Sequence, residues 1–167
     1  MKSLKFILVG TIVLAAAAIH ADIKSEWQKK LDTYCALFKK KDNKGMEAIL
    51  KENFSPNFKF MPMKGQGKPM NLKEWIDAQR SQLKMMDKCS EFTIHIDKTF
   101  GGKNVFHMAT TIHMVCTAKL DPKGKPGTIK SESMADQILL KEGDKWVVAA
   151  INVISDKMTF NGKPVKM

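Results

Sequence analysis

The chain has 167 residues and a formal net charge of +11 at pH 7, with 28 basic against 17 acidic side chains. This length supports one domain around one hydrophobic core, and a second domain is not expected. Arg80 is the single arginine, so specific nucleic-acid recognition through bidentate guanidinium contacts is not expected. The lysine-rich surface is interpreted as solubilising, with weak attraction to anionic lipid, polysaccharide or nucleic acid as the alternative.

The N-terminus has the three-part layout of a secretion signal. Two lysines lie among the first five residues, an apolar run of 14 residues extends from Phe6 to Ile19, and the small residue Ala21 follows. The run is shorter than the roughly 18 to 20 residues of a membrane-spanning helix, and an uncleaved anchor is the alternative. We therefore predict a signal peptide over residues 1–21 and a single domain over residues 22–167. The mature protein would be periplasmic or secreted, with no transmembrane segment left after cleavage.

The segment from Ser25 to Lys41 is predicted to form an amphipathic helix. Its apolar side chains recur at steps of four, three and four residues, and they are Trp27, Leu31, Tyr34 and Phe38. Ser25 is suited to cap the start, because its hydroxyl can accept a hydrogen bond from the backbone three residues on. The lysines at the end lie where the helix dipole favours cations.

Two further helices are predicted before the strands. A break at residues 42–45 ends the first helix, and Met46 begins a short second helix that stops before the following Ser-Pro pair. These first two helices should form a hairpin. Asn71, with Glu74 at the third helical position, caps a third helix that ends near Asp87.

From Ser90 onward the hydrophobic period changes from 3.6 to 2, which predicts antiparallel strands. The predicted strands are a short one at Phe58 to Phe60, then Ser90 to the Gly101-Gly102 turn, Val105–Ala118, Ile129–Leu140 and Trp146–Ile154. The remaining segments are turn material over residues 64–69, a loop over Asp121–Gly127, and a polar tail over Asp156–Met167 with a turn at Asn161-Gly162.

The three cysteines could form one disulfide and leave one thiol in an oxidising compartment. Cys89 and Cys116 flank the predicted hairpin and are the pair expected to meet, which leaves Cys35. A three-residue hairpin loop would align Ile112 and Met114 with the apolar face of the preceding strand. This even register puts the two cysteines on opposite faces, so their disulfide would need a β-bulge or a one-residue slip.

Asp136 is the carboxylate that the strand pattern singles out. It shares one strand face with Met134, Ile138 and Leu140. If that face is the inner one, the carboxylate is buried and becomes a candidate for binding or catalysis. The alternative is an outward-facing aspartate beside lysines.

The histidines suggest a metal site, which strand geometry does not favour. His107 and His113 lie six residues apart on one strand, about 20 Å at the usual rise, so they cannot share one ion. Adjacent His-Met pairs offer copper ligands, but neighbouring residues point to opposite faces, and methionine as core filler is preferred. No metal site and no cofactor is predicted, and no Gly-x-Ser-x-Gly or phosphate-loop motif occurs.

Two local runs and the order of elements carry a family resemblance. The run from Tyr34 to Phe38 leads into Asp42-Asn43-Lys44-Gly45, and Gly143-Asp144-Lys145-Trp146-Val147-Val148 opens the last strand. In these features the chain resembles the nuclear-transport-factor-2-like (NTF2-like) superfamily, which includes ketosteroid isomerases and SnoaL-like cyclases. The resemblance implies an α+β cone with a cavity, in which three N-terminal helices pack on a strongly curved, mostly antiparallel sheet. It leaves the activity open, because the superfamily holds both enzymes and non-enzymatic binders.

The resemblance to ketosteroid isomerases is partial. Tyr34 falls at the first-helix tyrosine that donates to the substrate carbonyl, and Asp136 falls near the strand aspartate that shares this oxyanion site. The aspartate base that precedes a proline on the first strand is replaced by Met61, which cannot accept a proton. The resemblance therefore implies hydrogen-bond donors without a base, which favours binding over isomerisation.

Three hypotheses follow for function. The first is an exported SnoaL-like protein that binds a small apolar or amphipathic molecule, with the cavity lined by Tyr34, Met61, Trp75, Asp136 and Asn152. The second is an isomerase, cyclase or dehydratase of the same fold that uses Asp136, Tyr34 or His113 as an acid or base. The third is a non-catalytic module that forms a homodimer through its sheet.

Overall fold

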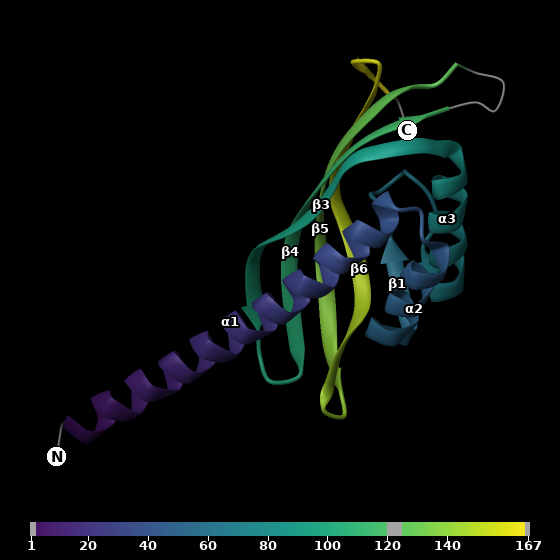
Figure 1. Ribbon diagram of the computed structural model, residues 1–167. Coiled ribbons are helices and arrows are strands. Elements are labelled where there is room, and N and C mark those ends of the chain that lie inside the picture. Colours follow the sequence, from purple (N-terminus) through teal and green to yellow (C-terminus); the bar gives the residue numbers. More distant parts are fainter. Residues whose placement is uncertain (1–2, 120–124, 166–167) are drawn as a thin grey trace.

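In the computed structural model, which describes residues 3–119 and 125–165, three helices pack on one face of a curved seven-stranded sheet (Figure 1). The helices are α1 (Ser3–Lys39), α2 (Asn43–Asn53) and α3 (Leu72–Met85). The strands are β1 (Phe54–Met61), β2 (Met70–Asn71), β3 (Met86–Gly101), β4 (Val105–Ala118), β5 (Gly127–Glu142), β6 (Lys145–Phe160) and β7 (Lys163–Pro164). The predicted α+β fold class is confirmed.

The first helix is longer than the pattern predicted. Ser25 is not a cap, because α1 already begins at Ser3 and runs through it. The first turns project beyond the sheet (Figure 1). Further along α1, the ring of His20 lies 4.7 Å from that of Phe106 on the sheet. Ile23, three residues later, is buried. No helix of the described residues has the length and apolar character needed to cross a membrane.

The third helix begins at its predicted cap, whereas α2 begins at Asn43, inside the predicted break and three residues before the predicted start at Met46. Asp42 accepts a hydrogen bond from the Gly45 backbone at 2.9 Å and starts α2. Asn71 and Glu74 form the predicted capping box at the start of α3, with reciprocal bonds of 3.0 and 2.8 Å. α3 ends at Met85, slightly before the predicted end, because the extended backbone of β3 begins at the next residue.

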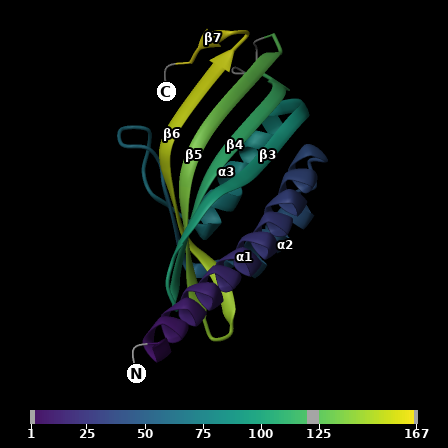
Figure 2. The same cartoon turned by 90° about the vertical axis from the view of Figure 1, so that its left-hand side faces the viewer.

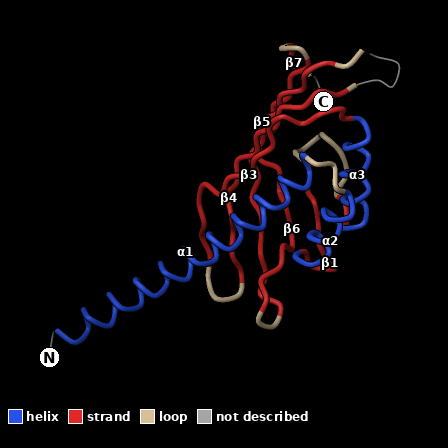
Figure 3. The backbone as a smooth tube through the Cα atoms, in the orientation of Figure 1, coloured by secondary structure: helices blue, strands red, loops and turns tan. Residues whose placement is uncertain are grey.

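The strand order is β2-β1-β6-β5-β4-β3, and β7 pairs with β6. All neighbours are antiparallel except β1 and β6, which run parallel. The sheet curves along its length and is not closed, and the helices lie on its concave side (Figure 2). The turns that join β3 to β4 and β5 to β6 lie at the same end of the sheet (Figure 3).

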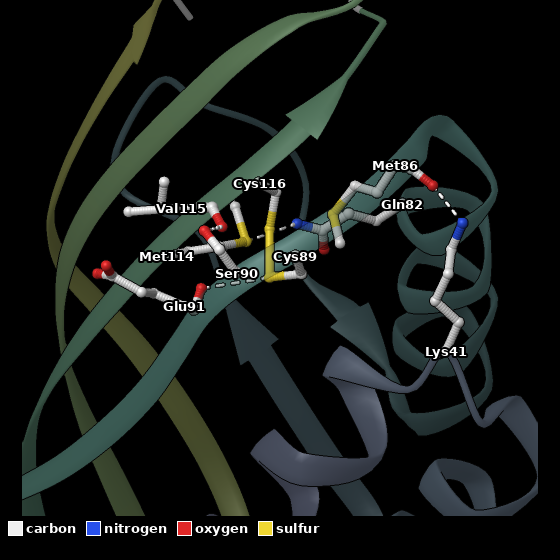
Figure 4. The surroundings of a disulfide bond; sticks show 9 residues. All are labelled: Lys41, Gln82, Met86, Cys89, Ser90, Glu91, Met114, Val115 and Cys116. Carbon is white, nitrogen blue, oxygen red and sulfur yellow. Dashed lines mark hydrogen bonds between the residues drawn. A yellow bond between two sulfur atoms is a disulfide. The ribbon is translucent and has the colours of Figure 1, made fainter.

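The β3–β4 hairpin has the predicted register around its apolar face. Phe92 pairs with Met114, and the next inward pair is also apolar. Ser90 is an extra residue on β3, because Cys89 pairs with Cys116 while Glu91 pairs with Val115. This bulge places both cysteines on the inner face, where they form a disulfide with a Cα–Cα distance of 4.0 Å (Figure 4).

The prediction of a polar C-terminal tail is wrong. β6 continues to Phe160, and the chain turns at Asn161 and Gly162, with φ of 49° and 78°, into β7. A register shift against β5 interrupts the alternation of inward and outward side chains along β6. The sequence pattern therefore did not reveal which residues of its last third point inward. The predicted loop over Asp121–Gly127 lies largely outside the described residues, and its last residue begins β5.

The core has two clusters on the concave face. One contains Phe38 of α1 and Leu83 of α3, packed against the disulfide end of the sheet. The other contains Ile23 and Trp27 of α1, packed against Phe106 and neighbouring side chains at the hairpin end. The two clusters hold α1 across the sheet along the part of the helix that follows His20.

Candidate ligand-binding cavity

A cavity of about 290 Å³ lies between the helices and the concave face of the sheet. Most of its lining is aliphatic or aromatic and comes from α1, α2, α3 and strands β1 and β3 to β6; the main apolar members are Trp27, Leu31, Phe38, Phe60, Trp75, Phe92, Ile94, Ile112, Met114, Ile151 and Met158. Phe60 and Trp75 stack with their ring centroids 4.2 Å apart. Ligand sites commonly combine such an apolar lining with a few placed polar groups.

The cavity exists because the middle of its floor carries small side chains. The inward positions of β5 there are Ser131, Ser133 and Ala135, whereas the facing positions of β3 and β4 are bulky, as at Phe92 and Ile112. The helices rest on the larger side chains of the neighbouring strands, so the space above the small side chains of β5 is not filled. The floor of β5 is therefore the sequence feature that opens the cavity.

Tyr34 and Gln79 form a buried polar pair in the lining. The Tyr34 hydroxyl donates to Oε1 of Gln79 at 3.0 Å, and both side chains are less than 9% exposed. Burial, with a smaller contribution from the neighbouring Cys35, raises the pKa of Tyr34 well above its usual value. The phenol is thus neutral and retains a lone pair that can accept a hydrogen bond.

Two other lining residues carry polar atoms without a protein partner. Nε1 of Trp27 and Oδ1 of Asn53 are buried and make no hydrogen bond to the described residues, whereas Nδ2 of Asn53 donates to the Ile49 carbonyl. A buried unsatisfied polar atom costs about 1–3 kcal/mol. Two residues of the cavity wall therefore carry an unpaired buried polar atom.

One end of the cavity is polar. The Ser133 hydroxyl donates to Oδ1 of Asp156 at 2.7 Å, and the Ser131 hydroxyl lies 3.4 Å from the same oxygen. Asp156 and Phe60 also line an adjoining outer space under the loop that contains Lys68. Sequence reasoning missed this group because Asp156 was assigned to the tail. The sequence did hold one sign of it: the inward residues of β6 change from odd to even positions after Val153.

Two of the five predicted lining residues, both on helices, line the cavity, and the other three lie on the convex face of the sheet. Tyr34 and Trp75 line the cavity. Met61, Asn152 and Asp136 are not part of its lining and lie side by side across β1, β6 and β5, on the convex face. The buried Gln137 beside Asp136 belongs to the lining instead, because the apolar face chosen from the pattern is the outer one.

Two of the three predicted acids and bases, Asp136 and His113, lie outside the cavity. Oδ2 of Asp136 is 2.9 Å from Nδ1 of His107, and the ring of Phe100 stacks on that histidine at 4.7 Å. His113 is exposed on the same face, 4.0 Å from Glu132. The structure therefore brings Asp136 together with His107, and it separates both Asp136 and His113 from Tyr34.

Cys35 lies outside the disulfide and is buried in the core cluster. Burial raises the pKa of its thiol from 9.0 to about 12. Because the thiolate is the reactive form, we expect native Cys35 to react with Ellman's reagent at pH 8 about a thousandfold more slowly than the thiol of the unfolded chain. Stopped-flow absorbance with and without guanidinium measures both rates, and a rapid reaction of the native protein would contradict this placement.

Among the comparisons with known proteins, the search of solved structures finds similar folds. A protein from Kribbella flavida superposes with a TM-score of 0.63 at 10% identity, covering 81% of this chain and 94% of its own. An NTF2-like superfamily protein from Salmonella enterica serovar Typhimurium LT2 has a TM-score of 0.59 at 15% identity, covering 88% and 94%. A conserved protein from Planctomyces limnophilus has a TM-score of 0.57 at 12% identity, covering 90% and 99%.

No family model and no curated protein matches the sequence. The structural likeness nevertheless shows an NTF2-like fold, with the helices packed on a curved, open sheet. The fold implied by the sequence resemblance is confirmed. Sequence identities at this level show the fold alone, so the function has to be argued from the site.

Proposed function

We propose that this protein binds a small, largely apolar molecule non-covalently in the cavity over β5. The observation that carries the proposal is the cavity of about 290 Å³ with aromatic and aliphatic walls. The polar groups of the wall, such as the Tyr34–Gln79 pair, are few enough to orient a ligand without dominating its binding.

A cavity-filling variant tests this proposal. Ala135→Leu adds bulk to the floor of the cavity, whereas Ala150→Leu makes the same change on the convex face, where Ala150 pairs with Lys59 and Ile138. N-phenyl-1-naphthylamine, a neutral dye that fluoresces in apolar surroundings, is the probe. We expect saturable binding to the wild type and Ala150→Leu, and a loss of about tenfold or more in affinity for Ala135→Leu.

The same titration can overturn the proposal. Equal dye affinity for Ala135→Leu and the wild type would place the dye elsewhere, and an absence of dye binding to the wild type would remove the support for an apolar ligand. Circular dichroism of each variant controls for the fold. Catalysis by Asp136 or His113 is not proposed, since neither side chain lines the cavity.

Dimer formation through the sheet is a second candidate role. The convex face exposes large apolar side chains, namely Phe100, Val105, Met134 and Leu140, which are 37–45% exposed. Apolar groups that gather on one face favour an interaction surface. Sedimentation velocity over a hundredfold range of concentration tests this role, and a strict monomer throughout would contradict it.

Export is proposed from the N-terminal pattern and two supporting features. The Cys89–Cys116 disulfide suits an oxidising compartment. Ile23 and Trp27 of α1 are buried against the sheet. Both follow the predicted cleavage after Ala21, so the mature chain would keep them. Intact mass measurement on protein from the native cell envelope should give a chain that begins at Asp22, and a retained N-terminus would contradict cleavage.

A further inference from the structure

A bulge on β6 turns a carboxylate into the cavity. Ala135 pairs with Val153 and Met134 pairs with Ser155, so Ile154 is an extra residue on β6. An extra residue exchanges the faces taken by the residues that follow it. Val153 and Asp156 consequently both line the cavity, although strict alternation would send Asp156 to the convex face.

The contacts of Asp156 leave part of its capacity unused. An ionised carboxylate is only an acceptor and offers about four lone-pair sites. The hydroxyls of Ser133 and Ser131 both donate to Oδ1, at 2.7 and 3.4 Å. Oδ2 receives no hydrogen bond from the described part of the chain.

Asp156 also makes no ion pair with the residues that the structure describes. The cation in the described lining is Lys30, whose ammonium pairs with Glu26 at 2.6 Å and lies 4.4 Å from the ring centroid of Trp27. Lys68 lines the adjoining outer space and is exposed, and it too is not paired with Asp156. Among the described residues, the uncompensated charge of the cavity is therefore negative, although the protein as a whole is strongly basic.

Aromatic side chains line the same spaces as this carboxylate. Phe60 lines both the cavity and the adjoining outer space, as Asp156 does. Its ring stacks on Trp75 at 4.2 Å. A cavity that holds both a carboxylate and aromatic rings suits an organic ammonium compound, because the ammonium group can form an ion pair and the rings can add cation–π or apolar contact.

We infer that the cavity takes a cationic amphiphile, an organic amine whose ammonium group binds Asp156 and whose apolar body lies over the β5 floor. This inference rests on the proposed function and narrows its ligand class. The neutral and anionic amphiphiles that fit the same apolar space lack this ion pair. An anionic head would meet the Asp156 carboxylate with like charge.

Three probes with one chain length and different head groups test the inference. Octylamine, octan-1-ol and octanoate compete with N-phenyl-1-naphthylamine for the wild-type protein at low ionic strength. We expect octylamine to bind about tenfold or more tightly than octanoate, with the alcohol between them. Added salt should weaken the amine and leave the alcohol unchanged.

Asp156→Asn should lower the affinity for octylamine to that for octan-1-ol. Glu132→Gln removes one carboxylate from an exposed position on the same sheet and should keep the wild-type order. If the dye binds but octanoate matches octylamine, or if Asp156→Asn keeps the amine preference, the head-group assignment is wrong and the apolar cavity stands. If neither the dye nor any probe binds the wild type, the proposed function fails as well.

Discussion

Replacing Phe106 with alanine is expected to lower the free energy of unfolding by about 4 kcal/mol. Phe106 is 1% exposed and packs in the cluster that holds Ile23 and Trp27 of α1 against the sheet. Its removal deletes apolar contacts and leaves a cavity that the rigid hairpin cannot close. For a domain of this size, such a loss lowers the melting temperature by about 8 to 16 °C.

Phe100→Ala is the matched control for this change. Phe100 lies in the same hairpin, near the Phe106 pairing position, but on the convex face, where it is 45% exposed. Its truncation should cost less than about 1 kcal/mol. Chemical denaturation of the two variants compares them directly, and equal losses would contradict the assignment of the concave face as the core.

Removing the disulfide is expected to cost about 3.5 kcal/mol. Cys89 and Cys116 are 27 residues apart in sequence, and the entropy of closing a loop of that length in the unfolded chain gives this magnitude. The double variant Cys89→Ala and Cys116→Ala removes the bond without leaving new thiols. Guanidinium unfolding of the wild type and the double variant measures the difference.

Dithiothreitol provides the internal control for the disulfide. It should destabilise the wild type by an amount close to that of the double substitution, and it should leave the double variant unchanged. A loss below about 1 kcal/mol, or a double variant that still responds to dithiothreitol, would contradict the assigned role of the bond. Cys35 lies outside the bond and is unaffected by either change.

The local features of the fold could be predicted because they depend on neighbouring residues. The capping box at Asn71 and Glu74 requires only two side chains at a fixed spacing. The β3–β4 register follows from matching two apolar faces across a short turn. Parity also showed in advance that the Cys89–Cys116 disulfide needs either a bulge or a one-residue slip, and the structure has the bulge.

The site was only half predictable because alternation does not say which strand face is concave. Tyr34 and Trp75 lie on helices, whose apolar stripe must face the sheet, and both line the cavity. Asp136 lies on a strand, and its apolar neighbours Met134 and Leu140 are exposed on the convex face. In the sequence, an exposed apolar strand face has the same pattern as a face that is buried in the core.

Bulges concealed the rest of the site. The extra residue at Ile154 changes the phase of β6, so Asp156 appears to leave the strand pattern at the point where it enters the cavity. Small residues at Ser131 and Ser133 likewise carry no signal of their own. They open space only because helices rest on the larger side chains of the neighbouring strands.

The most direct test of the central claim is a methyl NMR titration of isoleucine-labelled protein with N-phenyl-1-naphthylamine. Ile94, Ile112 and Ile151 line the cavity, whereas Ile138 lies on the convex face and Ile154 is 56% exposed. Binding in the cavity predicts large, saturable shifts of the first three methyl signals and little change in the other two. Shifts confined to Ile138 and Ile154, or none at saturating dye, would contradict a ligand-binding cavity in this fold.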